Sequence, residues 1–183
     1  VALLAALREP GLVGTLTLIE VALASLLPPA DAELDVEIAS RTSMLATVQS
    51  LARAGADEEA ARVLIDWLQG SPEGFARLPE SARDVLLENA KTVGPTFGVA
   101  APTVTRSQLR GLHMPTLVLH GEHTRPYFKR ISEAIASSIP GAIAAHIPQA
   151  AHMTLVERPA ETAALLLKFL AGPPVAGLRP VQT

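Results

Sequence analysis

The sequence predicts an α/β protein: about three parallel strands with flanking helices, interrupted by an all-helical segment. Two short runs of strand-forming residues, Thr15–Ile19 and Thr116–His120, stand far apart in the chain, and each has an apolar helical pattern next to it, as in a βαβ unit. Between these runs, apolar residues recur at helical spacing and no strand pattern occurs. These observations predict the fold class.

The first two elements are a helix and a strand. Val1–Arg8 is apolar on every face, which is typical of a helix buried on all sides, and Pro10 and Gly11 end it. Thr15–Ile19 alternates Thr with Leu, as a half-buried strand does. A helix followed by a strand after a short turn is half of a βαβ unit.

From Asp31 to about Gly94 the sequence predicts helices only. The first helix ends near Gly55, and its apolar stripe consists of Leu34, Ile38, Leu45, Val48 and Leu51. The second helix begins with Asp57 as its N-cap. The third helix runs from about Pro79 to Val93 and turns three apolar residues inward, Val85, Leu86 and Leu87. Trp67 and Met44 are expected in the core of this helical insert.

Strand and helix alternate again after Gly111. Thr116–His120 is typical of a parallel strand covered on both faces. Ala142–Ile147 predicts a further strand, and Pro159–Leu170 predicts a final helix. Between the two strands lies a helix with one apolar stripe, formed by Phe128, Ile131, Ile135 and Ile139.

Loops at the carboxyl ends of these strands are the expected place for a functional site, because parallel sheets bind ligands there. Three loops qualify: the residues from Glu20 onward, Gly121–Arg125 and Gln149–Thr154.

Several short motifs, taken in order, resemble the C-terminal half of the α/β-hydrolase fold family. They are Pro115–Glu122, Ile139–Ala142, Ile147–Met153, Glu157–Pro159 and Leu167–Leu170. The resemblance covers nearly all of residues 1–172, since the first helix looks like the one that follows the nucleophile elbow. It implies a partial hydrolase core at 1–29 and 103–172 and a helical cap at 30–102. The Pro and Gly residues at 173–183 predict a flexible tail there.

His152 matches the catalytic His of this family, which lies on a loop after the last strand. The family also needs a nucleophile on a strand-to-helix elbow, and the motif G-x-S-x-G occurs nowhere in the chain. Gly70–Gly74 has its Ser in the wrong place. The resemblance implies a nucleophile upstream of Val1, so the missing N-terminal half is the expected partner and we expect no hydrolysis by this chain alone.

The acid that orients the His is expected at Glu20. Many members of the family place an Asp where this chain has Thr124, whose hydroxyl carries no charge; others use a carboxylate at the end of the preceding central strand, where Glu20 stands. Glu122 is the rival. The structural alternatives are a loop histidine at position 152 and a Glu20 that caps a helix or pairs with an Arg.

His120 and His123 form an H-x-x-H pair, but they straddle a strand end and a turn, whereas the metalloprotease signature lies on a helix. We therefore expect no metal, and no cofactor. His113 and His146 are expected to be structural.

Composition excludes several classes of protein. The 183 residues have a net charge of −3 and no Cys, so neither nucleic acid binding nor disulfides are expected. The longest apolar run, Thr15–Pro29, contains Glu20 and is shorter than the roughly 20 residues of a membrane span. We expect a cytoplasmic protein acting on a small apolar or ester-type substrate. The alternative is a non-catalytic ligand-binding or interaction module.

Overall fold

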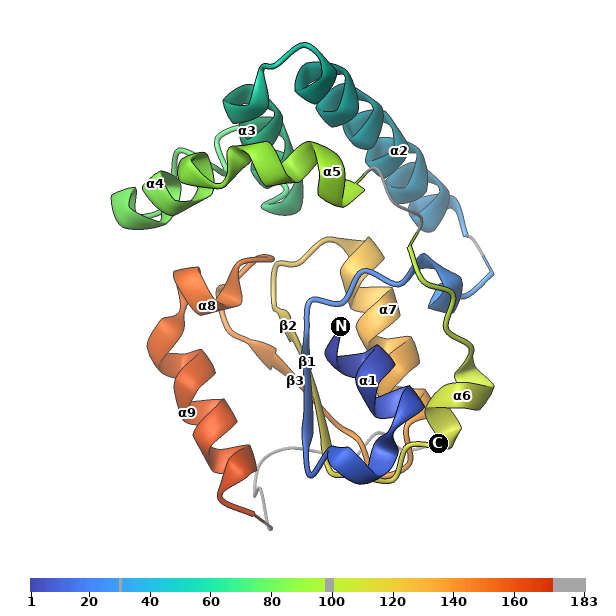
Figure 1. Ribbon diagram of the computed structural model, residues 1–183. Coiled ribbons are helices and arrows are strands. Elements are labelled where there is room, and N and C mark those ends of the chain that lie inside the picture. The colour runs from blue at the N-terminus through green and yellow to red at the C-terminus, as the bar shows by residue number, and fades with distance from the viewer. Residues whose placement is uncertain (30, 98–100, 173–183) are drawn as a thin grey trace.

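The computed structural model describes residues 1–29, 31–97 and 101–172, and in these ranges three strands form one parallel sheet (Figure 1). The order across the sheet is β1-β2-β3, and both neighbouring pairs are parallel. The strands are β1 (Leu16–Ile19), β2 (Thr116–Gly121) and β3 (Ile143–Ile147). All three predicted strands are confirmed.

Helices cover both faces of the sheet (Figure 1). On one face, α1 (Ala2–Arg8) and α7 (Pro126–Ser138) pack on alternate residues of β1 and β2, with Leu18 and Val118 in one buried cluster. On the other face, α9 (Pro159–Leu170) packs on Leu117 and Leu119 through Phe169. The near-continuous burial of β2 follows from this double cover.

The predicted stripe of α7 is confirmed. Phe128, Ile131, Ile135 and the C-cap residue Ile139 are all buried in the same cluster as β1 and β2. Pro126 stands in the first turn, where its missing N–H needs no partner.

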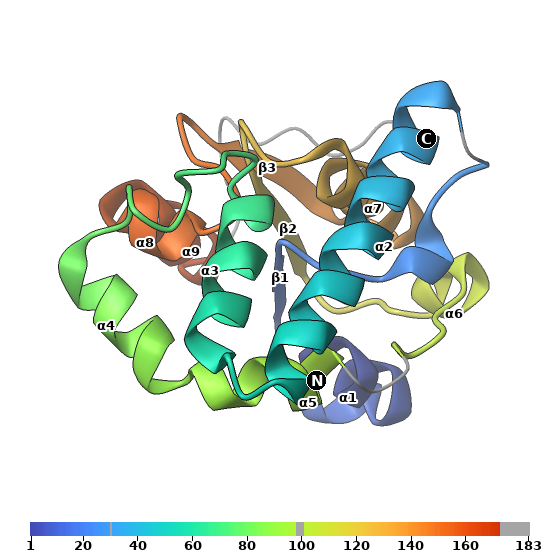
Figure 2. The same cartoon turned by 90° about the horizontal axis from the view of Figure 1, so that it is seen from above.

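The middle of the chain forms a helical segment above the carboxyl ends of the strands (Figures 1 and 2). Its long helices α2 and α3 pack on one another through Met44, Val48 and Leu64, while Trp67 contacts both this cluster and the core on α7. Its helices are α2 (Ala32–Arg53), α3 (Asp57–Leu68), α4 (Glu80–Glu88) and α5 (Val93–Phe97).

Three expectations for this segment are wrong in detail. The N-cap of α3 is Ala56, and Asp57 is the first helical residue. The third helix ends at Glu88, and a 3-10 turn then leads into α5. Val85 is 57% exposed. Three consecutive residues of a helix point in directions about 100° apart, so they cannot all face the core.

Two short helices were not expected from the sequence. One, α6 (Arg106–Arg110), begins with a capping box between Thr105 and Gln108. The other, α8 (Thr154–Glu157), follows the loop after β3. The tail predicted at 173–183 lies outside the described residues. Over the described ranges, the helices are either too short or too polar to cross a lipid bilayer.

Candidate active site

Glu20 lies at the carboxyl end of β1, at the point where the chain turns away from the sheet. Its side chain is only 4% exposed. Its backbone has a φ of 51°, in the left-handed region that residues other than Gly seldom adopt. Such backbone strain is concentrated at functional sites in proteins. The unusual turn aims the carboxylate across the end of β2.

The Glu20 carboxylate joins all three of the predicted loops. Its Oε1 accepts a hydrogen bond of 2.6 Å from the backbone N–H of Gly121, and its Oε2 accepts one of 2.8 Å from the Thr124 hydroxyl. The same Oε2 lies 3.0 Å from Nδ1 of His152. The structure thus brings together the two predicted site residues, which are 132 positions apart in the sequence.

The contact with Glu20 favours one tautomer of the neutral His152 ring. An ionised carboxylate only accepts hydrogen bonds, so beside such an acceptor Nδ1 of His152 is the atom that donates. In the neutral ring Nε2 is then unprotonated and able to accept a proton. The His152 side chain is 18% exposed, so it is partly accessible to solvent.

Phe128 supports the His152 ring from α7. The two ring centroids are 4.3 Å apart, with an angle of 44° between the planes. Phe128 is buried, and its ring also meets the ring of Trp67 from the helical segment at 5.9 Å. An aromatic row therefore runs from the helical segment to the histidine. The sequence showed the apolar stripe on which Phe128 lies but gave no signal that its ring would contact His152.

Gly121 allows the loop that carries His152 to approach the end of β2. A Cβ atom at this position would overlap the backbone carbonyl oxygens of Ala150 and Ala151. The loop is fixed in addition by the backbone N–H of His123, which donates to the Ala150 oxygen at 2.8 Å. This close contact between the end of β2 and the backbone of the loop fixes the position of the loop that carries His152.

Glu122 is exposed, and its carboxylate bonds to the backbone of Gln149 instead of to His152. Its Oε2 accepts a 2.8 Å hydrogen bond from the backbone N–H of Gln149, and this bond lowers the pKa of the Glu122 carboxyl below its ordinary value. Gln149 itself has a φ of 57°. Within the described residues, Glu20 and not Glu122 forms a hydrogen bond with His152. Glu122 braces the turn that leads toward the histidine.

The remaining histidines of this region do not gather into a metal site. The Nδ1 of His120 donates to the carbonyl oxygen of Gly121 at 2.8 Å, and the His120 ring stacks on that of His146, its register partner on β3. In the part of the chain that the structure describes, no three His, Cys, Asp or Glu side chains are grouped so that they could hold a metal ion.

Arg125 ties the helical segment to the loop of Thr124. Its Nε and Nη2 donate to the two carboxylate oxygens of Glu37 at 2.9 and 2.8 Å. Its Nη1 donates to the backbone oxygen of Trp67 at 3.3 Å, and the guanidinium lies 4.4 Å from the centre of the Trp67 ring. Sequence reasoning missed this residue, because an Arg next to a Pro in a loop carries no sign of its distant partners.

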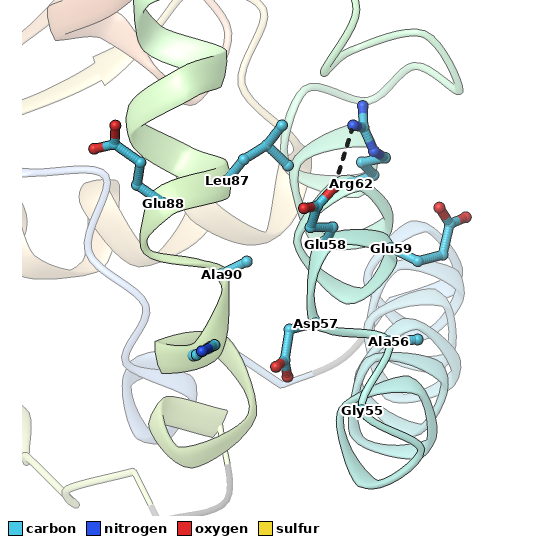
Figure 3. A pocket seen from close by; sticks show the side chains of 10 residues that line it. Gly55, Ala56, Asp57, Glu58, Glu59, Arg62, Leu87, Glu88 and Ala90 are labelled. Atoms are coloured by element: carbon cyan, nitrogen blue, oxygen red, sulfur yellow. Dashed lines mark ion pairs between the residues drawn. The ribbon is translucent and has the colours of Figure 1, made fainter.

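A cavity of about 520 Å³ lies inside the helical segment, between the start of α3 and the region after α4 (Figure 3). Acidic side chains, among them Asp57 and Glu88, line it together with Arg62, which is paired with Glu58 at 3.9 Å. Neither Glu20 nor His152 lines this cavity. It is therefore separate from the paired Glu20 and His152.

No family model matches the chain, and no curated protein is similar to it in sequence. Solved structures are similar. The carboxylesterase CesB from Bacillus subtilis superposes with a TM-score of 0.64 at 21% identity, over 92% of this chain and 55% of that one. A membrane phospholipase A, described as a bacterial virulence factor, superposes with a TM-score of 0.63 at 25% identity, over 93% and 53%.

A third similar structure is 2-hydroxy-6-oxo-6-phenylhexa-2,4-dienoate hydrolase from Rhodococcus sp. strain RHA1, with a TM-score of 0.56 at 16% identity. The match covers 93% of this chain and 59% of that chain. The present chain therefore spans little more than half the length of each of these three proteins.

Proposed function

From the α/β-hydrolase fold of this chain, we propose that it supplies the general base and the orienting acid for hydrolysis of an ester or related bond. The observation that carries the proposal is the 3.0 Å contact between Glu20 Oε2 and His152 Nδ1. It pairs a buried carboxylate with a partly exposed imidazole, which is the arrangement that a hydrolytic general base requires.

In the proposed reaction, Nε2 of His152 takes the proton from a nucleophilic hydroxyl as that oxygen attacks the carbonyl carbon of the substrate. Glu20 stabilises the resulting imidazolium through Nδ1–H. The same proton then passes from Nε2 to the departing alcohol oxygen, which leaves an acyl-enzyme. Water, activated by His152 in the same way, releases the acid and restores the nucleophile.

The nucleophile and the oxyanion-binding N–H groups are, in this proposal, supplied by polypeptide outside the 183 residues, since the sequence has no G-x-S-x-G motif. The chain alone is then inactive. The helical segment, which contains α2 to α5, acts as a cap over the site in this proposal. The substrate is, in this proposal, a small apolar or ester-type molecule.

The test is a steady-state assay with p-nitrophenyl esters on a longer polypeptide that contains this chain and the nucleophile. We expect Glu20→Gln to lower kcat by roughly 10³-fold or more and His152→Ala to lower it at least as far. Glu122→Gln is the matched control, because it removes a neighbouring carboxylate charge. It should leave kcat within about threefold of the parent rate.

Two results would overturn parts of the proposal. A normal rate for Glu20→Gln together with a collapsed rate for Glu122→Gln would transfer the acid role to Glu122. Hydrolysis by the 183-residue chain alone, abolished by His152→Ala, would show that the nucleophile lies within this sequence.

A further inference from the structure

Thr124 stands out among the threonines of the structure by the group to which its hydroxyl donates. Thr42, Thr47 and Thr96 each donate to the backbone carbonyl four residues earlier in a helix. Thr124 donates instead to the Oε2 of Glu20, 104 residues away, at 2.8 Å. A hydroxyl has a single proton, so this bond uses the whole donor capacity of the Thr124 side chain.

We infer that Thr124 is a positioning residue, whose hydroxyl holds Oε2 of Glu20 where Nδ1 of His152 can donate to it. The inference rests on the proposed function, because it assigns a role within the Glu20–His152 pair. Thr124 touches neither a substrate nor a reacting atom, and it acts through Glu20.

Thr124 is one of three groups that contact the Glu20 carboxylate. The oxygen Oε1 accepts the N–H of Gly121 at 2.6 Å, and without Thr124 the position of Oε2 would depend on His152 alone. Thr124 and His152 both meet Oε2, at 2.8 and 3.0 Å. Donors on both oxygens fix the plane of the carboxylate, and the plane decides whether Oε2 faces Nδ1.

Burial makes the Thr124 bond strong. Thr124 is 8% exposed and the Glu20 side chain 4% exposed, so water has little access to replace a lost donor. Hydrogen bonds to an ionised acceptor are roughly twice as strong as neutral ones. A neutral donor at position 124 also avoids the repulsion that a second carboxylate would create beside Glu20.

The inference is tested by the tautomer of His152, measured from ¹⁵N shifts of the ring in two-bond ¹H–¹⁵N correlation spectra, at a pH where the ring is neutral. The variants are Thr124→Val, which keeps the shape and removes the hydroxyl, and Thr124→Ser, which keeps the hydroxyl. Thr116→Val is the matched control, because Thr116 is buried at the start of β2 and donates to the backbone oxygen of Met114.

We expect Nδ1–H to predominate in the parent chain, in Thr124→Ser and in Thr116→Val. In Thr124→Val the Nε2–H form, which free imidazole side chains prefer, should become the major one. If Thr124→Val does not fold by circular dichroism, Thr124→Ala gives the same comparison without the extra methyl contact.

A second readout is kinetic and uses the longer polypeptide that contains this chain and the nucleophile. Thr124→Val should lower kcat about tenfold with KM nearly unchanged, and Thr124→Ser should restore kcat.

The outcomes separate the two proposals. A parent protein in which neutral His152 is protonated mainly at Nε2 would overturn the Glu20–His152 pair itself. A parent protein with Nδ1–H whose tautomer and kcat are unchanged in Thr124→Val would overturn only the role of Thr124.

Discussion

Glu37 of the helical segment and Arg125 of the loop after β2 form a two-point ion pair, with both carboxylate oxygens of Glu37 engaged. Their side chains are 12% and 17% exposed. Arg125 directly follows Thr124 in the sequence. The residue that attaches the helical segment is therefore adjacent to the residue that holds Glu20.

Breaking this ion pair should destabilise the protein and loosen the helical segment. Glu37→Gln leaves a largely buried guanidinium without its countercharge, and we expect a loss of about 2 kcal/mol in the free energy of unfolding. The measurement is urea denaturation followed by fluorescence of Trp67, the single Trp of the chain. The control is Glu73→Gln, which breaks an exposed pair with Arg77 and should change stability by under about 0.5 kcal/mol. Equal losses would contradict the structural importance of Arg125.

Gly121→Ala should disturb the site as well as the fold. The added methyl group would overlap two backbone carbonyls of the His152 loop, so the loop has to move away from the strand end. We expect a loss of about 2–3 kcal/mol on urea denaturation, accompanied by changed ring resonances of His152.

Gly14→Ala is the control for Gly121→Ala, because no heavy atom of the described chain beyond Gly14 and its two chain neighbours lies within 4 Å of a Cβ built there. It should stay within about 0.5 kcal/mol of the parent. A Gly121→Ala variant as stable as Gly14→Ala would show that the loop does not lie against β2.

Tyr127 should make the protein less stable at alkaline pH. Burial raises the pKa of the Tyr127 phenol, an effect that the Arg41 guanidinium, 5.0 Å from the ring centre, partly opposes. The unfolded chain loses this proton first as pH rises. The contribution of the raised Tyr127 pKa to the free energy of unfolding is therefore complete below the ordinary pKa of 10.0. It is lost as pH rises through the higher pKa of the folded state.

Tyr127→Phe tests this expectation. The variant should lose less stability than the parent in urea titrations above about pH 10. Near neutral pH it should be at least as stable, because among the described residues the buried hydroxyl has no hydrogen-bond partner. Parallel pH profiles for the two proteins would contradict the raised pKa of Tyr127.

Glu122 should contribute to stability at the acid end. The N–H of Gln149 favours the charged carboxylate and lowers the pKa of Glu122. Its contribution is present above the ordinary pKa of 4.5 and is lost as pH falls through the lower folded value. Glu122→Gln should thus be less stable than the parent near pH 6, and the difference should vanish well below about pH 4. A difference that persists in acid would point to a cause other than charge.

The sequence was sufficient for the sheet and for the α7 stripe, because strand composition and helical periodicity are local signals. It also led to Glu20 and His152, through a resemblance rather than through spacing. Asp57 was misplaced because acidic side chains are favourable both at an N-cap and in the first helical turn. The contacts of Thr124 and Arg125 depend on how segments from distant parts of the chain meet, and no local pattern contains that information.

The wide separation in sequence also constrains the order of folding. Glu20 and Gly121 are 101 residues apart, and the whole helical segment lies between them. Pairing β1 with β2 closes a long loop, which is slow compared with contacts between neighbouring helices such as α2 and α3. During synthesis on the ribosome, the helical segment can therefore become structured before β2 has been made and can pair with β1. We therefore expect the pairing of Glu20 with His152 to be a late event in the folding of this chain.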